Sequence, residues 1–512
     1  MTGELVPAVG DPERDLIASG REALRRHAWQ EAYALLARAD REAELPGEDL
    51  EAFAEAAYFA ARAAEVPDIL ERAFRSRLAA GDSTRAAHLA LQQARQQALQ
   101  GKMSIASAWA RRGERLLEGQ PESYAHGYLA LFRSDAARAS GDLEGAIALA
   151  IEAVDIGGRT GDDELRAWAL AALGTLRIAS GAAPDGLALL EEASIAAVSG
   201  ELPPLASGVI CCTMIATCRD LTDYQRASEW IEATDRYCKN QSVSGFPGAC
   251  RIHRAEIVAL GGAWERAERE LERATIELAP YHATPIQADG FYALGEVRRL
   301  EGDLAGAEEA LRQAHALGRS PHPALALIRL AEGKTHAAAS AMNAALVEEA
   351  WDTWARARLL PAQVEISIAA GDRVRARSAA DELETIVTAY PTPALQAESH
   401  LSRGRVMLAD GDPSAAAREL RSAIKLWREV GSPYQVARCR MLLAEALRAL
   451  DDDEGVELEL RTARDEFERL GARVDLAVAE RALAVAADRR TRPTQARRTF
   501  MFTDIVSSTK LA

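Results

Sequence analysis

The sequence predicts an all-α protein, a solenoid in which antiparallel helix pairs stack along one axis. Three observations support this fold class. The chain has 512 residues, several times a typical domain, so it holds several domains or one extended repeat array. Hydrophobic residues make up 48% and aromatic residues only 5%, with alanine and leucine dominating, which suits closely packed helices and disfavours a β-sandwich. A short pattern also returns with a period of about 40 residues.

The returning pattern is a small residue, usually glycine, followed five positions later by alanine or another small residue. Its occurrences begin at Gly101, Gly141, Gly181, Thr222, Gly262, Gly302, Gly333, Gly371, Gly411 and Asp451. The interval between successive starts is nearly constant, except for one clearly shorter step from Gly302 to Gly333. A period this regular indicates a repeat array. The region before Gly101 also looks like helical pairs, although its register is poorer.

One unit shows why the pattern predicts paired helices. Asp142 follows Gly141 and can cap a helix, because its carboxylate accepts hydrogen bonds from free backbone N–H groups. Apolar residues then follow at helical spacing, namely Leu143, Ala146, Ile147, Ala150, Ile151 and Val154. We expect a turn at 158–162 and an antiparallel partner helix at 165–179. Neither helix can bury its apolar stripe alone, so the units must stack.

These helix pairs resemble the tetratricopeptide repeat (TPR) family. The family pattern has a large residue, a Leu-Gly pair, and small or apolar residues twelve, sixteen and nineteen positions after that glycine. The match here is Phe291, Leu294, Gly295, Ala307, Leu311 and Ala314, and its second half recurs at Ala267, Leu271 and Ala274 and at Ala416, Leu420 and Ala423. The period of about 40 exceeds the family's usual period of about 34, which implies longer helices or turns. The resemblance covers residues 12–486 and implies a TPR-like α-solenoid, preceded by a disordered segment at 1–11.

The charge distribution disfavours some classes of partner. From Asp488 onward, six basic residues face two acidic ones, a net of +4, so residues 1–487 carry −20 of the chain's net −16. An acidic body repels phosphates, so we expect no direct DNA binding by the array. A solenoid groove of this charge would suit a basic or helical peptide. The chain begins without a signal-peptide pattern and has no apolar run long enough to span a bilayer, which predicts a cytoplasmic protein without membrane contact.

Several residues inside the array belong to types or patterns that occur in binding and catalytic sites, but ordinary structural roles explain them better. Gly333-Lys334-Thr335 matches the tail of a phosphate-binding loop, yet Ile328 stands where that loop needs another glycine. The six cysteines lack zinc-ligand spacing and are expected to be reduced and mostly buried. The longest interruption, 236–250, reads as a connection between repeats, with a partner contact as the alternative. Packing is likewise expected of Trp109, Trp168, Trp230, Trp264, Trp351, Trp354 and Trp427, with ligand stacking by one or two of them left open.

The last residues differ from the array. Residues 487–498 are rich in arginine, contain Pro493 and lack helical periodicity, which predicts a linker. Residues 499–503 are β-branched and aromatic, as in a short buried strand. Asp504 ends this strand, and residues 507–509 offer N–H groups and a hydroxyl cap at a helix start. A carboxylate beside free N–H groups suits a metal–triphosphate complex.

Residues 499–512 closely resemble the opening motif of class III adenylate and guanylate cyclases, through Phe502, Asp504, Ile505 and Thr509. The resemblance implies that Asp504 ligates two catalytic metal ions, Mg²⁺ or Mn²⁺, and that the Ile505 carbonyl contacts one of them. It places Ser507, Ser508 and Thr509 along the phosphates of ATP or GTP, although Ser507 occupies the family's glycine position. It also implies a homodimer through the cyclase domain.

The rest of a cyclase domain would lie downstream of these residues, so we expect a fragment that is inactive by itself. The predicted function is that of a bacterial signalling protein whose TPR-like array docks a partner and controls a C-terminal class III cyclase. The alternative is a non-enzymatic TPR scaffold, or the sensor array of a LuxR-type transcriptional regulator. The fold alone does not identify the function, which depends on the residues of a specific site.

Overall fold

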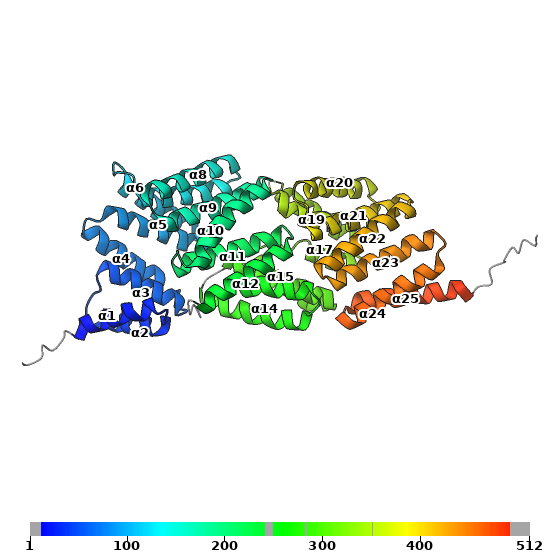
Figure 1. Ribbon diagram of the computed structural model, residues 1–512, viewed down its shortest axis with the longest axis horizontal. Helices are drawn as coiled ribbons and strands as arrows, with labels where there is room; N and C mark the ends of the chain where they lie inside the picture. The colour runs from blue at the N-terminus through cyan, green and yellow to red at the C-terminus, as the bar shows by residue number, and fades with distance from the viewer. Residues whose placement is uncertain (1–11, 241–248, 282–283, 351, 492–512) are drawn as a thin grey trace, which may run out of the picture.

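The computed structural model describes residues 12–240, 249–281, 284–350 and 352–491 (Figure 1). Within these ranges all regular elements are helical: twenty-five α-helices and one short 3-10 helix, η1 (Ala279–Tyr281). Consecutive helices pack side by side as antiparallel pairs, which confirms the TPR-like helical array. The helices α1 and α25 lie toward opposite ends of the long axis of the molecule (Figure 1).

The odd-numbered helices, α1 to α23, are the first helices of twelve pairs. They are α1 (Pro12–Arg25), α3 (Gly47–Phe59), α5 (Ser83–Leu99), α7 (Tyr124–Ala139), α9 (Asp163–Ala179), α11 (Pro204–Asp220), α13 (Ala249–Leu260), α15 (Thr284–Glu301), α17 (Ala324–Ala331), α19 (Thr353–Ala369), α21 (Pro393–Asp410) and α23 (Pro433–Ala449). A further helix, α25 (Arg473–Thr491), follows the last pair.

The even-numbered helices are the second helices of the pairs. They are α2 (Trp29–Glu42), α4 (Val66–Ala79), α6 (Met103–Leu117), α8 (Leu143–Thr160), α10 (Ala183–Ser199), α12 (Tyr224–Asn240), α14 (Trp264–Leu278), α16 (Leu304–Ala316), α18 (Thr335–Glu348), α20 (Arg373–Ala389), α22 (Pro413–Val430) and α24 (Asp453–Leu470). Most helix lengths fall between that of α3 and that of α8, so a pair with its two turns fills the period seen in the sequence.

A residue in the left-handed region joins the first helix of a pair to the second. All ten predicted repeat starts have positive φ, from 54° at Thr222 to 93° at Gly181. The following residue closes the first helix, as where the Asp142 N–H donates to the Ala137 carbonyl over 2.9 Å. Asp142 then caps α8 by accepting the backbone N–H of Gly145, as the sequence predicted. A glycine and an aspartate therefore make a complete turn between two helices.

Paired helices cross at the small residues that the TPR resemblance singled out. A Cβ atom added to Gly295 in α15 would lie 2.8 Å from Cγ of Leu311 in α16, closer than two carbon atoms approach. Ala307 and Leu311 are both buried at this crossing. The same relation recurs in the pair α21–α22, where a Cβ on Gly404 would lie 2.8 Å from Cγ of Leu420. Glycine is needed at these positions because the backbone of one helix touches a leucine of the other.

Some helix boundaries differ from those expected. The helix α8 continues to Thr160, so the turn begins after the predicted residues 158–160. Ile151 belongs to the predicted apolar stripe of α8 but is 37% exposed, because the helix buries Ala153 and Ile156 in its place. The helix α25 continues to Thr491, well into the predicted linker at 487–498. Its alanine-rich stretch up to Ala487 and the helix-compatible arginines allow the helix to run on.

The structure also explains two irregularities of the period. The short interval between Gly302 and Gly333 contains α17, which has only eight residues and is the shortest α-helix described. The poor register before Gly101 arises because His27 and Ala61 occupy the positive-φ position, with φ of 57° and 60°, where later repeats mostly use glycine. The turn is the same, but its glycine signal is missing.

Segments 170 to 176 residues apart in the sequence lie side by side, because the array coils into a superhelix. Three contacts mark the seam between successive turns. They are Trp354 Nε1 donating to the Ile178 carbonyl over 2.8 Å, the hydroxyl groups of Thr222 and Thr392 at 3.1 Å, and Arg473 Nε donating to the Glu301 carbonyl over 2.8 Å.

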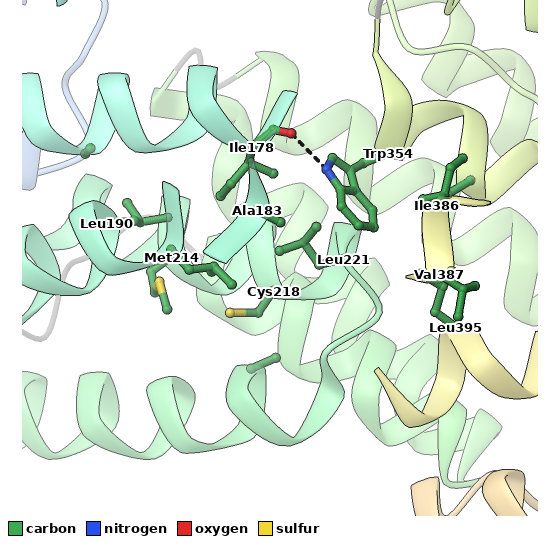
Figure 2. Close-up of a cluster of buried hydrophobic side chains, with 14 of the residues drawn as sticks. Ile178, Ala183, Leu190, Met214, Cys218, Leu221, Trp354, Ile386, Val387 and Leu395 are labelled. Carbon is green, nitrogen blue, oxygen red and sulfur yellow. Dashed lines mark hydrogen bonds between the residues drawn. The ribbon is translucent and has the colours of Figure 1, made fainter. Parts of the chain in front are cut away.

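A shared hydrophobic core fills part of this seam. Figure 2 shows Met214 and Leu221, from α11 and its end, on one side of Trp354, with Ile386 and Leu395 of α20 and α21 on the other. All five side chains are buried. Because this core joins residues of distant repeats, the seam contributes stability that neighbouring pairs alone would not provide.

The described residues also bear on the predictions about cysteines and membrane spans. All six cysteines are free, and four are buried: Cys211, Cys212, Cys218 and Cys439. No described helix combines the length and apolar character that crossing a bilayer requires. The predicted disordered start at 1–11 and the predicted strand and turn at 499–512 lie outside the described residues, as does most of the interruption at 236–250 after α12.

Candidate binding face on the first helices

The first helices form one side of the array, which we call the inner face. On this side α19 meets α9 and α11, and α25 meets α15. The ends of second helices join the same seam, as where Tyr390 at the end of α20 bonds to Asp223. The second helices form the outer face. Large hydrophobic side chains are most exposed there, at Ile195, Ile276, Val347, Val374 and Leu458, which are 58 to 76% exposed. The inner face therefore holds the more enclosed surface.

Charged residues recur on the inner face at equivalent positions of successive first helices. Glu55, Arg95 and Asp135 follow one another at intervals of one repeat on α3, α5 and α7. Another set with the same interval, Glu365, Arg405 and Glu445, lies on α19, α21 and α23. Each set alternates acidic, basic and acidic residues along the array.

In the C-terminal part of the inner face, Glu365 and Arg405 of this set form an ion pair, whereas Glu445 forms none with a described residue. Glu365 contacts Arg405 at 3.0 Å and Arg438 at 2.6 Å. Burial alone would raise the pKa of Glu365, but the two guanidinium groups outweigh it and lower that pKa to about 2. The carboxylate is therefore ionised and already engaged, which leaves little charge for a ligand.

The central part of the inner face is paired in the same way. Arg219 of α11 contacts Asp220 at 2.8 Å, Glu256 at 3.2 Å and Asp289 at 3.7 Å. Arg358 of α19 contacts Asp220 at 2.6 Å across the seam. Despite burial, these two guanidinium groups hold the pKa of Asp220 well below its usual range. Here ion pairs join the two superhelical turns.

In the N-terminal part of the inner face some charges are paired, such as Glu51 of α3 with Arg85 of α5, but four others are not. Glu55, Arg95, Asp135 and Glu164 form no ion pair with any residue that the structure describes. Arg95 instead stacks on Trp168, with its guanidinium carbon 4.1 Å from the ring centroid. Its charge interacts with Asp135 and Glu164 over longer distances.

Burial shifts the titration of these unpaired groups toward their neutral forms. Burial and repulsion from Glu164 raise the pKa of Glu55 to about 7. Burial likewise raises the pKa of Asp135 and of Glu164, and it lowers the pKa of Arg95. Arg95 and Asp135 are nevertheless exposed, so water screens their charges. Glu55 and Glu164 are the partly buried charges of this surface.

Two aromatic rings accompany these charges. Tyr128 and Trp168 occupy equivalent positions, one repeat apart, on α7 and α9. Both are half-buried, so part of each ring remains accessible. We call Glu55, Arg95, Tyr128, Asp135, Glu164 and Trp168 the inner-face cluster.

The residues singled out in the sequence fall elsewhere. Asp504, Ile505, Ser507, Ser508 and Thr509 lie outside the described residues, so their predicted metal and phosphate contacts stay predictions. Gly333 is a positive-φ turn residue between α17 and α18, and Lys334 beside it contacts Glu332 at 2.9 Å. Gly333-Lys334-Thr335 is therefore part of the same helix-joining turn that recurs in the other repeats.

Most of the predicted tryptophans pack within the array. Trp264, Trp354 and Trp427 are buried, as expected. Trp109 packs edge-on against Phe74, with centroids 5.3 Å apart, and Trp230 packs partly buried against the seam core. Trp351 lies outside the described residues. Trp109 and Trp168 are both half-buried beside an arginine, and the closer of the two contacts is that of Arg95 with Trp168, at 4.1 Å against 5.5 Å for Arg112 with Trp109.

Sequence reasoning missed the inner-face cluster. The signal was present, because Glu55, Arg95 and Asp135 share one register of the repeat. Periodicity places these residues on equivalent faces, but it does not say which face is enclosed or which charges find partners. Those properties depend on how side chains of neighbouring pairs pack against one another.

One cavity of about 470 Å³ lies elsewhere, between α22, α23, α24 and the turn at Gly261. Its wall includes Arg440, which forms an ion pair with Glu459. Within the described residues no three histidine, cysteine, aspartate or glutamate side chains converge as metal ligands do.

Comparison with known proteins yields no sequence relative. No family model and no curated protein matches the chain. Two solved structures that superpose on it are the crystal structure of the APC/C hetero-tetramer Cut9-Hcn1 and that of BtubC (BKLC) from P. vanneervenii. The first has 12% identity and a TM-score of 0.49, covering 94% of this chain and 91% of that chain. The second has 18% identity and a TM-score of 0.29, covering 48% of this chain and 98% of that chain.

Proposed function

We propose that the array is a protein-interaction scaffold that holds a partner on the N-terminal part of its inner face. The observation that carries this proposal is that Glu55, Arg95, Asp135 and Glu164 lie on α3 to α9 without an ion pair to any described residue. By contrast, Glu365 and Asp220 each contact two arginines. Glu55 and Glu164 are partly buried without an ion pair. Partial burial of an unpaired charge is costly, and a bound ligand would offset that cost. Stacked helix pairs also offer an extended surface to a partner protein.

Site-specific crosslinking tests this function. A photoreactive amino acid replaces either Asp135 on the inner face or Ile195, which is 58% exposed on the outer face. We expect one protein to crosslink through position 135, to be recovered by mass spectrometry and to bind the purified chain directly. Equal labelling from both positions, or no direct binding by the recovered protein, would reject the scaffold function on this face.

A second candidate function is control of a class III nucleotide cyclase. The observation in its favour is the motif at Phe502, Asp504, Ile505 and Thr509. In this proposal Asp504 and the Ile505 carbonyl would hold Mg²⁺ or Mn²⁺, Ser507, Ser508 and Thr509 would contact the phosphates of ATP or GTP, and two chains would pair through the cyclase domain.

The test uses the product of the full coding frame that contains residues 499–512. Formation of 3′,5′-cyclic nucleotide with Mg²⁺ or Mn²⁺, and its loss in Asp504→Ala, would support this candidate. Activity that persists in the alanine variant would contradict the role of Asp504, and absence of any cyclic product would leave the scaffold function alone.

A further inference from the structure

We propose that Cys212 and Cys250 are a modification site, at which a small-molecule disulfide oxidises the two thiols to a reversible protein disulfide. The sulfur atoms of Cys212 in α11 and Cys250 in α13 lie 3.0 Å apart. These helices are the first helices of neighbouring pairs and pack against each other. A disulfide holds its sulfur atoms about 2.0 Å apart, so a movement of about 1 Å completes the bond.

The contact between sulfur atoms distinguishes these two cysteines from the other four. The structure describes all six, and no other two of them are joined by a thiol hydrogen bond. Cys211 and Cys238 lie near enough to Cys250 to interact with it electrostatically, but neither is hydrogen-bonded to it. The remaining two are buried in hydrophobic clusters. The geometry therefore selects one pair.

The two thiols differ in their surroundings, which assigns them different roles. Cys212 is 7% exposed, whereas Cys250 is partly exposed. The hydrogen bond with Cys250, together with burial, raises the pKa of Cys212 well above its usual range. Because a thiolate is the form that attacks a disulfide, protonated Cys212 does not begin the exchange. Cys250 therefore reacts with the oxidant first, and Cys212 reacts second.

The exchange balances with oxidised glutathione as the small-molecule disulfide. The Cys250 thiolate attacks one glutathione sulfur, the sulfur–sulfur bond of glutathione breaks, and one glutathione thiolate leaves. Cys212 then gives its proton to the leaving thiolate and attacks the Cys250 sulfur, which expels the second glutathione. Two protein thiols are oxidised, and one glutathione disulfide is reduced to two thiols. Excess dithiothreitol reverses the reaction.

The disulfide would join two helix pairs beside the seam. The helix α11 packs against α19 and contributes Met214 to the seam core (Figure 2). A bond between residues 38 positions apart would hold α13 to this helix and restrict the unfolded chain. We therefore expect oxidation to raise the midpoint of thermal unfolding by roughly 3–6 °C. In compartments that keep thiols reduced, such disulfides are mostly transient and redox-sensing.

Peptide mapping of the full chain tests the pairing. The chain is incubated with oxidised glutathione, its free thiols are blocked with iodoacetamide, and it is digested with trypsin. Trypsin places Cys212 in the peptide 178–219 and Cys250 in the peptide 240–251. We expect mass spectrometry to find these peptides linked, with fragment ions that place the bond at Cys212 and exclude its neighbour Cys211. Dithiothreitol should remove the link.

Alanine variants test the assigned roles. Cys212→Ala should abolish the link and the rise in the unfolding midpoint, and Cys250 should then retain one glutathione as a mixed disulfide. Cys250→Ala should leave Cys212 unmodified, because the first thiol of the exchange is missing. The matched control is Cys211→Ala, which removes the adjacent buried thiol and should keep both the link and the rise. Circular dichroism would confirm that each variant folds.

A link from Cys250 to Cys211 or Cys238 would overturn the proposal. Glutathione that stays on Cys250 of the unaltered chain would do the same, as would two free thiols after prolonged oxidation. Mapping of the unaltered chain decides the pairing even where an alanine variant does not fold. Neither cysteine belongs to the inner-face cluster, so crosslinking through position 135 tests the scaffold function separately.

Discussion

At the scale of single residues, the turn between paired helices shows how one backbone conformation recurs with different side chains. The left-handed position is glycine in most repeats but histidine at 27, alanine at 61, threonine at 222 and aspartate at 451. A Cβ atom in this region costs about 1–2 kcal/mol. The array tolerates the cost at a few turns because each turn is fixed by the two helices that it joins.

Ala61→Gly is expected to stabilise the protein by roughly 0.5–1 kcal/mol. The substitution removes a Cβ from a residue with φ of 60°, and part of the gain is offset by the greater freedom of glycine in the unfolded chain. Urea unfolding monitored by circular dichroism would measure the change. As a control, Ala136→Gly at an exposed position inside α7 should destabilise the protein by roughly 1 kcal/mol. Destabilisation by both changes would contradict the strain at residue 61.

Glu55 gives a prediction about pH. Burial and repulsion from Glu164 raise the pKa of Glu55 to about 7, so between pH 4.5 and 7 the folded chain holds a proton that the unfolded chain has released. The free energy of unfolding therefore falls as the pH rises through this window, and the full cost is present above it. Glu55→Gln removes that cost.

We expect Glu55→Gln to stabilise the protein by roughly 1–3 kcal/mol at pH 8 and by much less at pH 5. Urea unfolding at both pH values would measure the difference, with Glu144→Gln at an exposed site as the control. A gain that is the same at both pH values would show that the amide acts through packing and that ionisation of Glu55 carries no cost.

At the scale of helices, the crossing within each pair depends on a missing side chain. Gly295 and Gly404 both face a leucine sixteen residues later, and in both cases a Cβ would lie 2.8 Å from the leucine Cγ. The close approach lets Ala307 and Ala416, twelve residues after each glycine, become fully buried. Larger residues at the crossing would separate the helices and open cavities along the stripe.

Gly295→Ala should destabilise the protein by roughly 1–3 kcal/mol, because the new methyl group must displace Leu311 or the backbone near Ala307. The matched control is Gly158→Ala, which also adds a methyl group inside a helix but meets no atom within 4 Å. This control should stabilise the protein by roughly 0.5–1 kcal/mol. Thermal unfolding of both variants would test the pair of predictions, and a stabilising Gly295→Ala would show that the crossing is looser than described.

At the scale of the whole molecule, the seam between superhelical turns separates this array from a simple chain of neighbouring repeats. In a simple array each pair contacts only the next, and stability is a sum of local terms. Here Trp354 bonds to Ile178, and a common core contains residues from 167 to 227 and from 354 to 406. Distant repeats should therefore unfold together.

Trp354→Ala should destabilise the protein by about 3–5 kcal/mol and divide its unfolding into separate transitions. The substitution removes a buried ring and the indole donor at the seam. Differential scanning calorimetry would detect the loss of cooperativity. Trp109→Ala, which removes a ring packed on Phe74 of a neighbouring pair, should lower stability without dividing the transition. A single transition in Trp354→Ala would contradict coupling through the seam.

The sequence by itself determined the helix pairs, their turns and the small residues at their crossings. These features follow from contacts between residues close in the chain, and such contacts leave periodic patterns: all ten predicted turn positions have positive φ, including Thr222 and Asp451. The sequence did not reveal the turns at His27 and Ala61, where the glycine signal is absent, or the extension of α25 to Thr491.

Only the tertiary structure decided which charged residues are paired with one another. Glu55 and Glu365 each begin a set of charged residues spaced one repeat apart, yet Glu365 meets two arginines and Glu55 meets none among the described residues. The difference lies in packing between neighbouring pairs, because Arg405 lies 3.0 Å from Glu365 whereas Arg95 stacks on Trp168. Superhelical closure adds contacts between distant repeats, such as that between Arg358 and Asp220. A local period carries no record of such distant contacts, because they depend on small rotations between pairs that accumulate along the array.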